Sequence, residues 1–330
     1  MSNAPSSGES GSLRSLDLRL PPLPQTLPQV LELLHRPGFV PAEELAEVVQ
    51  GDPAAVARLL KHINSAYYGL RRSITSVERA IRMMGPTTAA GTVIGLRMLE
   101  MEDLLHGPAG PCLARLLRHS ESTAFLTQYL IGRAAPEANT PEPTPNAPSG
   151  RGFAEGLLHD FGKLVLLYNY PEKAAALYDQ QVLDEYLAGT EARALEQLVF
   201  GCDHTEAGRY AAAEMHFPPV LTDVIRHHHA PDQAESNTAA PTLLRAVRAA
   251  NRATKAMGPA FAGLHPSPPD LDWAACAEAP VWSHWQADPE ANAPPMDLMD
   301  DLRAKRSEIV HFTKFFLEIP EVLDPIPPPS

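Results

Sequence analysis

The sequence lacks the cysteine content and the long apolar segments of secreted and membrane proteins. Its 330 residues include three cysteines, Cys112, Cys202 and Cys276, which are far apart and form no CxxC motif. So few cysteines are typical of a reducing compartment and exclude a cysteine-built zinc site. No run approaches the ~18 consecutive apolar residues of a membrane helix, and the N-terminus lacks the apolar segment of a signal peptide. We therefore expect a cytoplasmic globular protein with no membrane partner.

Positive charge is also scarce. Lys and Arg total 27 against 40 Asp and Glu, which gives a formal net charge of −13. Non-specific binding of nucleic acid depends on Lys and Arg neutralising phosphates, so we expect no nucleic-acid partner. The helix–Gly–helix pattern around Gly85 could be a DNA-binding helix-turn-helix. It carries no basic recognition face, and packing of two helices explains it better.

Common catalytic motifs are missing as well. The sequence has no GxSxG elbow, no Walker-type phosphate loop, no GxGxxG after a strand and no HExxH. Cys202 precedes His204 by two residues and could suggest a thiol nucleophile, but nothing positions a base beside it. The sequence therefore offers no standard nucleophile or phosphate-binding loop.

Apolar residues recur at helical spacing, and no segment alternates as a half-buried strand does. Asp52 is a predicted N-cap before Pro53, Thr75 and Glu78 form a predicted capping box, and Gly85 ends that helix. We predict an all-α, multi-helix bundle. The predicted helices lie near residues 29–34, 42–49, 53–64, 77–84, from 86 onward, 104–133, 153–168, 172–178, from 184 onward, 191–200, 204–216, 219–229, 241–256 and 297–318.

The adjacent pair His159–Asp160 is the most informative feature. It lies inside the apolar segment 153–168, which we predict to be one continuous helix. A buried imidazole or carboxylate without partners costs several kcal/mol or titrates to its neutral form. The pair therefore predicts either a metal site or a closed hydrogen-bond network.

Further histidines can supply the partners. His119, His204 and His228 each lie on an apolar or small-residue stripe of a predicted helix. Gly152, Gly156 and Gly162 share the face of His159, which predicts close helix packing. Imidazoles and a carboxylate suit Fe, Mn, Zn or Ni. We expect His227 and His229 to be exposed neighbours of His228, because adjacent helical positions diverge. The other histidines are interpreted as core residues with hydrogen-bonded rings: His35, His62, His216, His265, His284 and His311.

Several segments in order resemble the HDOD family, the HD-related output domains of bacterial signalling proteins. The N-terminal part of the resemblance is LPPLP at 20–24, DPAAVARLLKHINSAYYG at 52–69 and SITSVERAIRMMG at 73–85. The downstream part is FAEGLLHDFGKLVL at 153–166 and DHTEAGRYAAAEMHFPPVLTDVIRHHHAP at 203–231.

The resemblance implies an N-terminal helical subdomain packed on a degenerate HD-like helical subdomain. By position, the resemblance implies that His119, His159, Asp160, His204 and His228 are remnant metal ligands, and it places the final aspartate of the HD pattern at Asn251. A neutral amide there weakens metal binding. The resemblance covers an HDOD domain at 20–231, with parts 20–105 and 106–231. From composition we predict a disordered tail at 1–18, a flexible insertion at 134–150, and an extension at 232–330 that contains an irregular Pro/Trp segment at 258–295.

Three functions remain open at this point. The resemblance favours a non-catalytic regulatory module that contacts signalling proteins, gated by a ligand or metal in the HD-like part. The alternative is a metal-dependent phosphohydrolase of a nucleotide or cyclic dinucleotide. A third is a purely structural histidine cluster, with the partner contact made by the segment of Trp273, Trp282 and Trp285.

Overall fold

The structure is a computed structural model that describes residues 17–22, 26–36, 40–64, 68, 70–98, 106–133, 152–178, 192–230, 241–257, 300–302, 304–306 and 309. The described residues form helices joined by turns, with no strand among them, which confirms the all-α prediction. The helices are α1 (Thr26–His35), α2 (Ala42–Gln50), α3 (Pro53–Ile63), α4 (Val77–Met84), α5 (Pro86–Met98), α7 (Gly110–Arg133), α8 (Phe153–Leu158), α9 (Phe161–Asn169), α10 (Pro171–Leu177), α12 (Ala192–Phe200), α13 (His204–Glu214), α14 (Pro219–His227) and α15 (Pro241–Ala256).

Some predictions fall outside the described residues. They concern the N-terminal tail, the insertion at 134–150, the helix from 184, the segment 258–295, Cys276, and the histidines at 265, 284 and 311. The predicted helix 297–318 is described only at 300–302, 304–306 and 309. Within the part of the chain that the structure covers, no helix combines the length and apolarity needed to span a bilayer.

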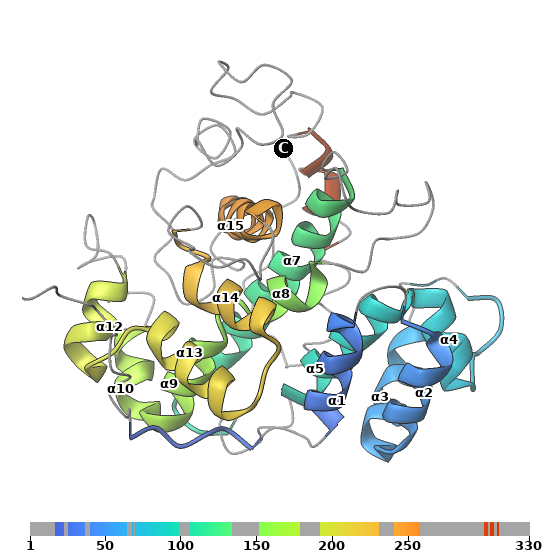
Figure 1. Cartoon of the computed structure of the whole chain (residues 1–330), viewed down its shortest axis with the longest axis horizontal. Coiled ribbons are helices and arrows are strands. Elements are labelled where there is room, and N and C mark those ends of the chain that lie inside the picture. The colour runs from blue at the N-terminus through green and yellow to red at the C-terminus, as the bar shows by residue number, and fades with distance from the viewer. Residues whose placement is uncertain are drawn as a thin grey trace, which may run out of the picture.

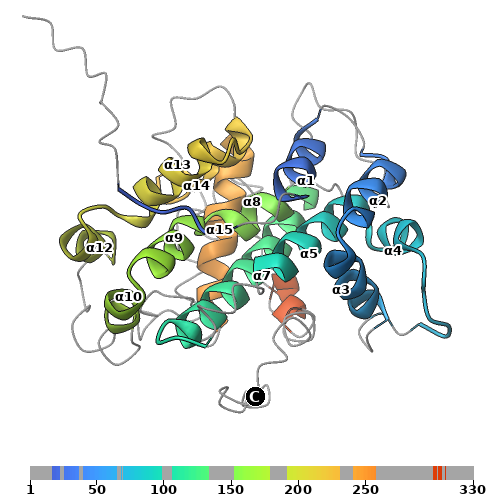
Figure 2. The ribbon, with the colours of Figure 1, turned by 90° about the horizontal axis from the view of Figure 1, so that it is seen from below.

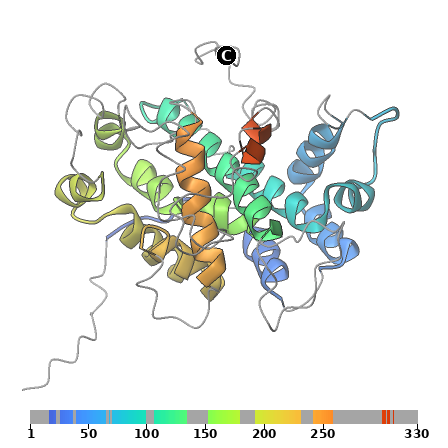
Figure 3. The ribbon, with the colours of Figure 1, turned by 90° about the horizontal axis from the view of Figure 1, so that it is seen from above.

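Two groups of helices meet along α5 and α8 (Figure 1). Helices α1–α5 pack on one another at one end, while α9, α10, α12 and α13 lie at the other (Figure 2). Between them α7 packs against both α8 and α15, and α15 crosses this central pair (Figure 3). One apolar core is continuous from Leu31 and Ile81 through Leu117 to Leu166 and Leu221, so the two groups share their interior.

The helix starts largely follow the sequence signals. Asp52 caps α3 by accepting hydrogen bonds from the backbone N–H groups of Ala54 and Ala55, at 3.1 and 3.2 Å, as predicted. The capping box predicted at Thr75 and Glu78 is wrong, because Ser76 caps α4 and accepts from the Arg79 N–H at 3.3 Å. Serine and threonine are both good caps, so neighbouring hydroxyl residues leave the start ambiguous by one position.

The continuous helix predicted over residues 153–168 is wrong. Helix α8 ends at Leu158, α9 begins at Phe161, and His159 and Asp160 form the turn between them. Asp160 has φ −97° and ψ 20°, outside the helical region. On a continuous helix two adjacent side chains would diverge by about 100°. The break instead allows both to face the same side.

Glycines allow the helices around this turn to approach closely, as predicted. A Cβ added to Gly156 would lie 2.6 Å from the Cα of Ala124 on α7. A Cβ added to Gly162 would lie 1.7 Å from the carbonyl oxygen of His204 on α13. Backbone atoms cannot yield as a flexible side chain can, so these contacts fix the spacing of α7, α8, α9 and α13.

Replacing Gly162 with alanine should therefore destabilise the fold. We expect Gly162→Ala to lose about 1–3 kcal/mol of unfolding free energy, or more, because the new methyl group must displace the backbone of α13. Gly132→Ala is the matched control, since Gly132 is exposed on α7 and an added Cβ meets no atom within 4 Å. The control should be neutral or gain up to about 1 kcal/mol from helix propensity. Urea unfolding followed by circular dichroism measures both, and equal stabilities would contradict the packing argument.

The histidines away from the HD pair do not all behave as predicted. His62 is fully buried and its Nε2 lies 3.1 Å from the Tyr68 hydroxyl, which confirms a hydrogen-bonded core residue. His216 is exposed, with φ 57°, directly after α13, so its assignment to the core is wrong. Apolar periodicity placed His216 within the predicted helix 204–216, but α13 ends at Glu214 and His216 adopts a left-handed backbone conformation beyond it.

Burial of His62 should make stability depend on pH. Desolvation lowers its pKa from 6.5 to about 4, so the unfolded chain binds a proton between these values and the folded chain does not. Above pH 6.5 both states hold His62 neutral and the free energy of unfolding is unaffected. As pH falls from 6.5 toward 4, protonation of the unfolded chain lowers the free energy of unfolding by about 3 kcal/mol in total. His62→Gln should lose less stability over this range than the wild type. The exposed His106→Gln should keep the wild-type slope in urea titrations at each pH, and identical slopes for all three would refute the assignment.

Candidate metal centre

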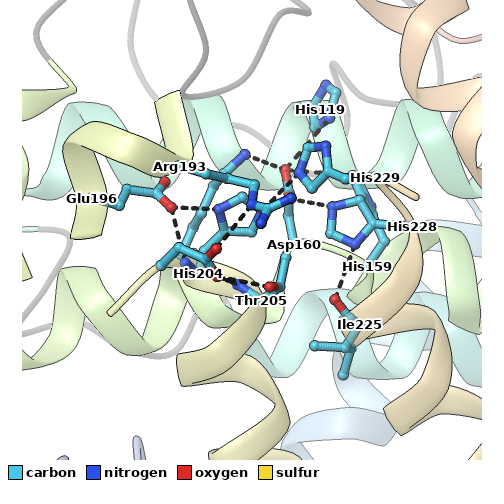
Figure 4. Close-up of polar contacts among 12 residues, drawn as sticks. His119, His159, Asp160, Arg193, Glu196, His204, Thr205, Ile225, His228 and His229 are labelled. Carbon is cyan, nitrogen blue, oxygen red and sulfur yellow. Dashed lines mark hydrogen bonds and ion pairs between the residues drawn. The ribbon is translucent and has the colours of Figure 1, made fainter. Parts of the chain in front are cut away.

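The four predicted histidine ligands converge in the interior around the carboxylate of the fifth, Asp160 (Figure 4). Its Oδ2 atom lies 3.7 Å from His119 Nε2 and 3.4 Å from His159 Nε2. Its Oδ1 atom lies 3.5 Å from His204 Nε2 and 3.4 Å from His228 Nε2. All five side chains are buried. The predicted set is thus brought together, with one pair of imidazoles on each side of one carboxylate.

The imidazoles of His159 and His228 are each oriented by a hydrogen bond at Nδ1. His159 Nδ1 donates to the Gly156 carbonyl at 2.8 Å, and His228 Nδ1 lies 3.1 Å from the Ile225 carbonyl. A carbonyl only accepts, so both rings carry their proton on Nδ1 and direct the Nε2 lone pair at Asp160. Both Nε2 atoms are buried without a hydrogen-bond partner. This is the tautomer and orientation that metal-binding histidines adopt.

His204 receives its orientation from a carboxylate that the sequence analysis missed. Its Nδ1 lies 2.6 Å from Glu196 Oε2, and its backbone N–H donates to the same oxygen at 2.9 Å. The Tyr178 hydroxyl donates to Glu196 Oε1 at 2.9 Å. Burial alone would raise the pKa of Glu196, but His204 outweighs it and the pKa is lowered, so the carboxylate is ionised. The eight-residue separation of Glu196 and His204 across a turn gives no recognisable spacing signal.

The electrostatics keep Asp160 charged beside two neutral rings. Burial lowers the pKa of His159 and His228, so both rings are neutral near pH 7. Burial would raise the pKa of Asp160, but the ammonium group of Lys163 outweighs it, and the pKa lies well below its usual value. The centre therefore contains one carboxylate anion beside the neutral rings of His159 and His228.

Lys163 supplies the matching cation and was also missed. Its Nζ lies 2.6 Å from Asp160 Oδ2, and both side chains are fully buried. The three-residue spacing of the two was visible in the sequence. Lysine is rarely buried without a charged partner, so an HDxxK pattern inside an apolar segment could have revealed the pair.

His229 was wrongly predicted to be an exposed neighbour of His228. Helix α14 ends at His227, and beyond its end the ring of His229 turns inward (Figure 4). Its Nε2 lies 2.9 Å from His204 Nε2. The divergence of adjacent helical positions does not apply to residues that follow the helix.

Helix α15 contributes two polar residues near this region. Asn251 is buried, with its Oδ1 lacking a hydrogen-bond partner, and among the described residues it makes no hydrogen bond to the histidine cluster. Lys255 lies one turn later and is half-buried. Burial, and then the charge of Lys163, lower the pKa of Lys255 to about 7. Asn251 at this position offers no negative charge to a metal.

The donor atoms fit a divalent transition ion. Two groups can each gather ligand atoms within 4.8 Å of one another, His119 with His159 and Asp160, and Asp160 with His204, His228 and His229. Imidazole nitrogen with carboxylate oxygen is a donor set for Fe, Mn, Ni or Zn. A bound ion would act as a Lewis acid on a phosphoryl oxygen or on water. Cys202 belongs to neither group, and burial raises the pKa of its thiol to about 11, so the thiol is protonated near pH 7.

Comparison with known proteins supports the fold. The chain is 20% identical to an HDOD domain protein of unknown function from Geobacter sulfurreducens (91% of this chain, 93% of that one, TM-score 0.65). It is 18% identical to a protein from Marinobacter aquaeolei VT8 assigned provisionally to signal transduction (93% and 64%, TM-score 0.66). A provisionally assigned phosphohydrolase from Shewanella amazonensis SB2B is 21% identical (90% and 95%, TM-score 0.58).

A sequence relative and a family model complete the comparison. An uncharacterised protein of Treponema pallidum (strain Nichols) is 24% identical over 218 residues, which are 64% of this chain but only 37% of that protein. The chain therefore spans little more than a third of this relative. The model of the HDOD domain matches residues 20–231, well over half of the chain, and the protein belongs to the HDOD family.

Proposed function

We propose that this protein is a regulatory HDOD module that transmits a signal through contacts with other proteins and does not hydrolyse phosphoesters. The observation that carries the proposal is the fully buried ion pair of Lys163 Nζ and Asp160 Oδ2, at 2.6 Å. The ammonium group holds one of the two oxygens with which Asp160 would bridge a pair of metal ions. A two-metal hydrolase needs both ions to stabilise the attacking and the leaving oxygen.

The position of Asn251 supports the same conclusion. The HD pattern would place an aspartate there, and the amide leaves that ligand set without its second anion. With Asp160 as the one carboxylate and Lys163 beside it, the Oδ2 side carries little net negative charge to attract a divalent ion. The Marinobacter protein, provisionally a signal transduction protein, is in keeping with this role.

Phosphoester hydrolysis is the alternative. Two observations favour it. Asp160 belongs to both possible groups of metal ligands, and the Shewanella protein is provisionally described as a phosphohydrolase. Its substrate would be a nucleotide or cyclic dinucleotide. The missing carboxylate at Asn251 and the position of Lys163 count against it.

A hydrolysis screen separates the two functions. The full chain, supplied separately with Mn²⁺, Fe²⁺, Ni²⁺ and Zn²⁺, should show no turnover of nucleotides, cyclic dinucleotides or p-nitrophenyl phosphate above the level of its His159→Ala variant. Turnover that His159→Ala abolishes would establish the hydrolase and overturn the regulatory proposal.

Affinity capture with the tagged full chain from its native host tests whether the protein acts through contacts with other proteins. A partner that the wild type retains and Asp160→Asn loses would support the regulatory proposal. Equal recovery by both proteins would show that partner binding does not depend on the Asp160 centre.

The ion pair itself predicts a pattern of stabilities. Lys163→Met should cost about 3–5 kcal/mol, because it leaves the Asp160 carboxylate buried without its ammonium partner. The double variant Lys163→Met/Asp160→Asn, which removes both charges, should regain most of this loss. Urea unfolding with a chelator present measures the three proteins without interference from metal. If the double variant were less stable than the single one, Lys163 would not be there to balance the charge of Asp160.

A further inference from the structure

We propose that residues 17–22 form a releasable strap, an extended segment that the chain itself supplies to a peptide-docking site at the end of α9. The docking residue is Asn169, the last residue of that helix. In Figure 1 and Figure 2 the strap is the dark-blue, non-helical segment beside α9. The inference rests on the proposed function only where it treats release of the strap as an input to a regulatory module.

One side-chain amide holds the strap. The backbone N–H of Arg19 donates to Asn169 Oδ1 at 2.8 Å, and Asn169 Nδ2 donates to the Arg19 carbonyl at 2.8 Å. The same Nδ2 donates to the Val165 carbonyl at 2.9 Å, which fixes the amide on α9. Asn169 thus pairs with both backbone groups of Arg19, as a residue of a neighbouring β-strand would. Such pairing binds an extended peptide by its main chain and leaves the choice of side chains to the surrounding surface.

The chain uses the same arrangement a second time, at the end of α3. Asn64 Nδ2 donates to the carbonyls of Leu60 and Ile74, both at 2.7 Å, and Asn64 Oδ1 accepts from the Ile74 N–H at 2.7 Å. Each asparagine lies at the C-terminal end of a helix, binds the carbonyl four residues earlier, and clamps one extended residue. The recurrence identifies the arrangement as a general way of holding extended chain in this fold.

The two clamps differ in how closely their ligand is tethered. Ile74 lies 10 residues from Asn64, so the short connection keeps it near the clamp even when the hydrogen bonds break. Arg19 lies 150 residues from Asn169 in the sequence. A short loop returns its ligand to the clamp at high effective concentration, and a distant segment does so less readily. The Asn169 clamp is therefore the one whose ligand can leave.

Few other contacts hold the strap. Among the described residues, its backbone hydrogen bonds go to Asn169 alone. Leu18 and Pro21 are buried, and the Arg19 guanidinium lies 5.7 Å from the centre of the Tyr168 ring. Local opening has to break only these contacts, whereas the core of α9 opens only with a larger part of the fold. Release of the strap is therefore an event of its own.

The two prolines suit the strap to docking and release. Pro21 and Pro22 have no N–H donor and hold φ near about −65°, so this part of the chain stays extended when it is released. A segment that is already extended loses less conformational entropy on docking. An extended Leu-x-Leu-Pro segment of a partner protein would have the same backbone groups and apolar side chains. It is the kind of ligand that would compete for Asn169.

Release would remove a connection between the two groups of helices. Helix α9 begins beside Asp160, carries Lys163, and ends at the Asn169 clamp. At its other end the strap leads to α1, which packs on α2 and α5. The docked strap therefore ties the helix that carries Lys163 to the N-terminal helices.

Amide hydrogen exchange of the full chain, followed by NMR, tests whether the strap opens separately. The Arg19 amide of the wild type should be protected, yet should exchange faster than the Leu166 amide in the core of α9. Asn169→Ala should speed the exchange of Arg19 roughly 10–100-fold, the effect of losing two net hydrogen bonds. Asn64→Ala is the matched control. It removes the equivalent clamp on Ile74 and should leave the exchange of Arg19 unchanged.

A synthetic peptide of residues 15–24 tests the docking site in trans. Leu18→Asp in the full chain should release the strap, because it places a charge at a buried position. At millimolar peptide, comparable to the effective concentration of a tethered segment, the peptide should then shift the NMR signals of the Asn169 side-chain amide. Binding should weaken at least about 10-fold when Asn169→Ala is added, or when the peptide carries Arg19→Pro and lacks the N–H donor.

Four results would contradict the inference. They are an Arg19 amide that exchanges as in an unfolded chain, an Arg19 amide that exchanges only together with Leu166, equal effects of Asn169→Ala and Asn64→Ala on Arg19, and no peptide binding by folded Leu18→Asp. Circular dichroism monitors folding of each variant. None of these measurements involves phosphoester turnover. Turnover in the hydrolysis screen therefore refutes only the proposed function, and a strap that does not open refutes only this inference.

Discussion

The charge of one buried carboxylate governs the arrangement of this protein's interior. Asp160 is almost fully buried and its pKa lies below the usual value, so it remains ionised where an isolated anion would cost more than the whole stability of a domain. Lys163, with its Nζ 2.6 Å from Oδ2, offsets this cost. His119 on α7, His204 on α13 and His228 after α14 approach the same carboxylate, so these helices and the turn between α8 and α9 meet at one point.

The convergence depends mainly on helix ends. His159 and Asp160 lie between α8 and α9, His204 is the first residue of α13, and His229 follows the end of α14. Beyond the end of a helix, consecutive side chains are no longer held about 100° apart, so two neighbouring residues can face the same centre. The backbones at these ends also come close together. Gly162, whose Cβ would collide with the His204 carbonyl, is the residue that permits it.

The sequence was sufficient for those features that depend on local pattern. The all-α class, the cap at Asp52 and the inward direction of His119 all follow from apolar periodicity and capping chemistry. Features that depend on where a helix stops were not predictable in the same way. The apolar segment around His159 and Asp160 has the composition of one helix. Tertiary contacts that direct both side chains inward override this local preference and interrupt the helix. Glu196 was missed because its partner His204 lies across a turn, at a separation with no regular spacing.

The ammonium group of Lys163 is a positive charge that is covalently attached beside the carboxylate of Asp160, so it does not exchange with solution. The histidine cluster joins the start of α13 to the end of α14, and Glu196 connects the cluster to α12. In the proposed regulatory module, a ligand held at this point would bear on the mutual position of α12, α13 and α14, since binding energy can shift a conformation only through contacts that differ between states.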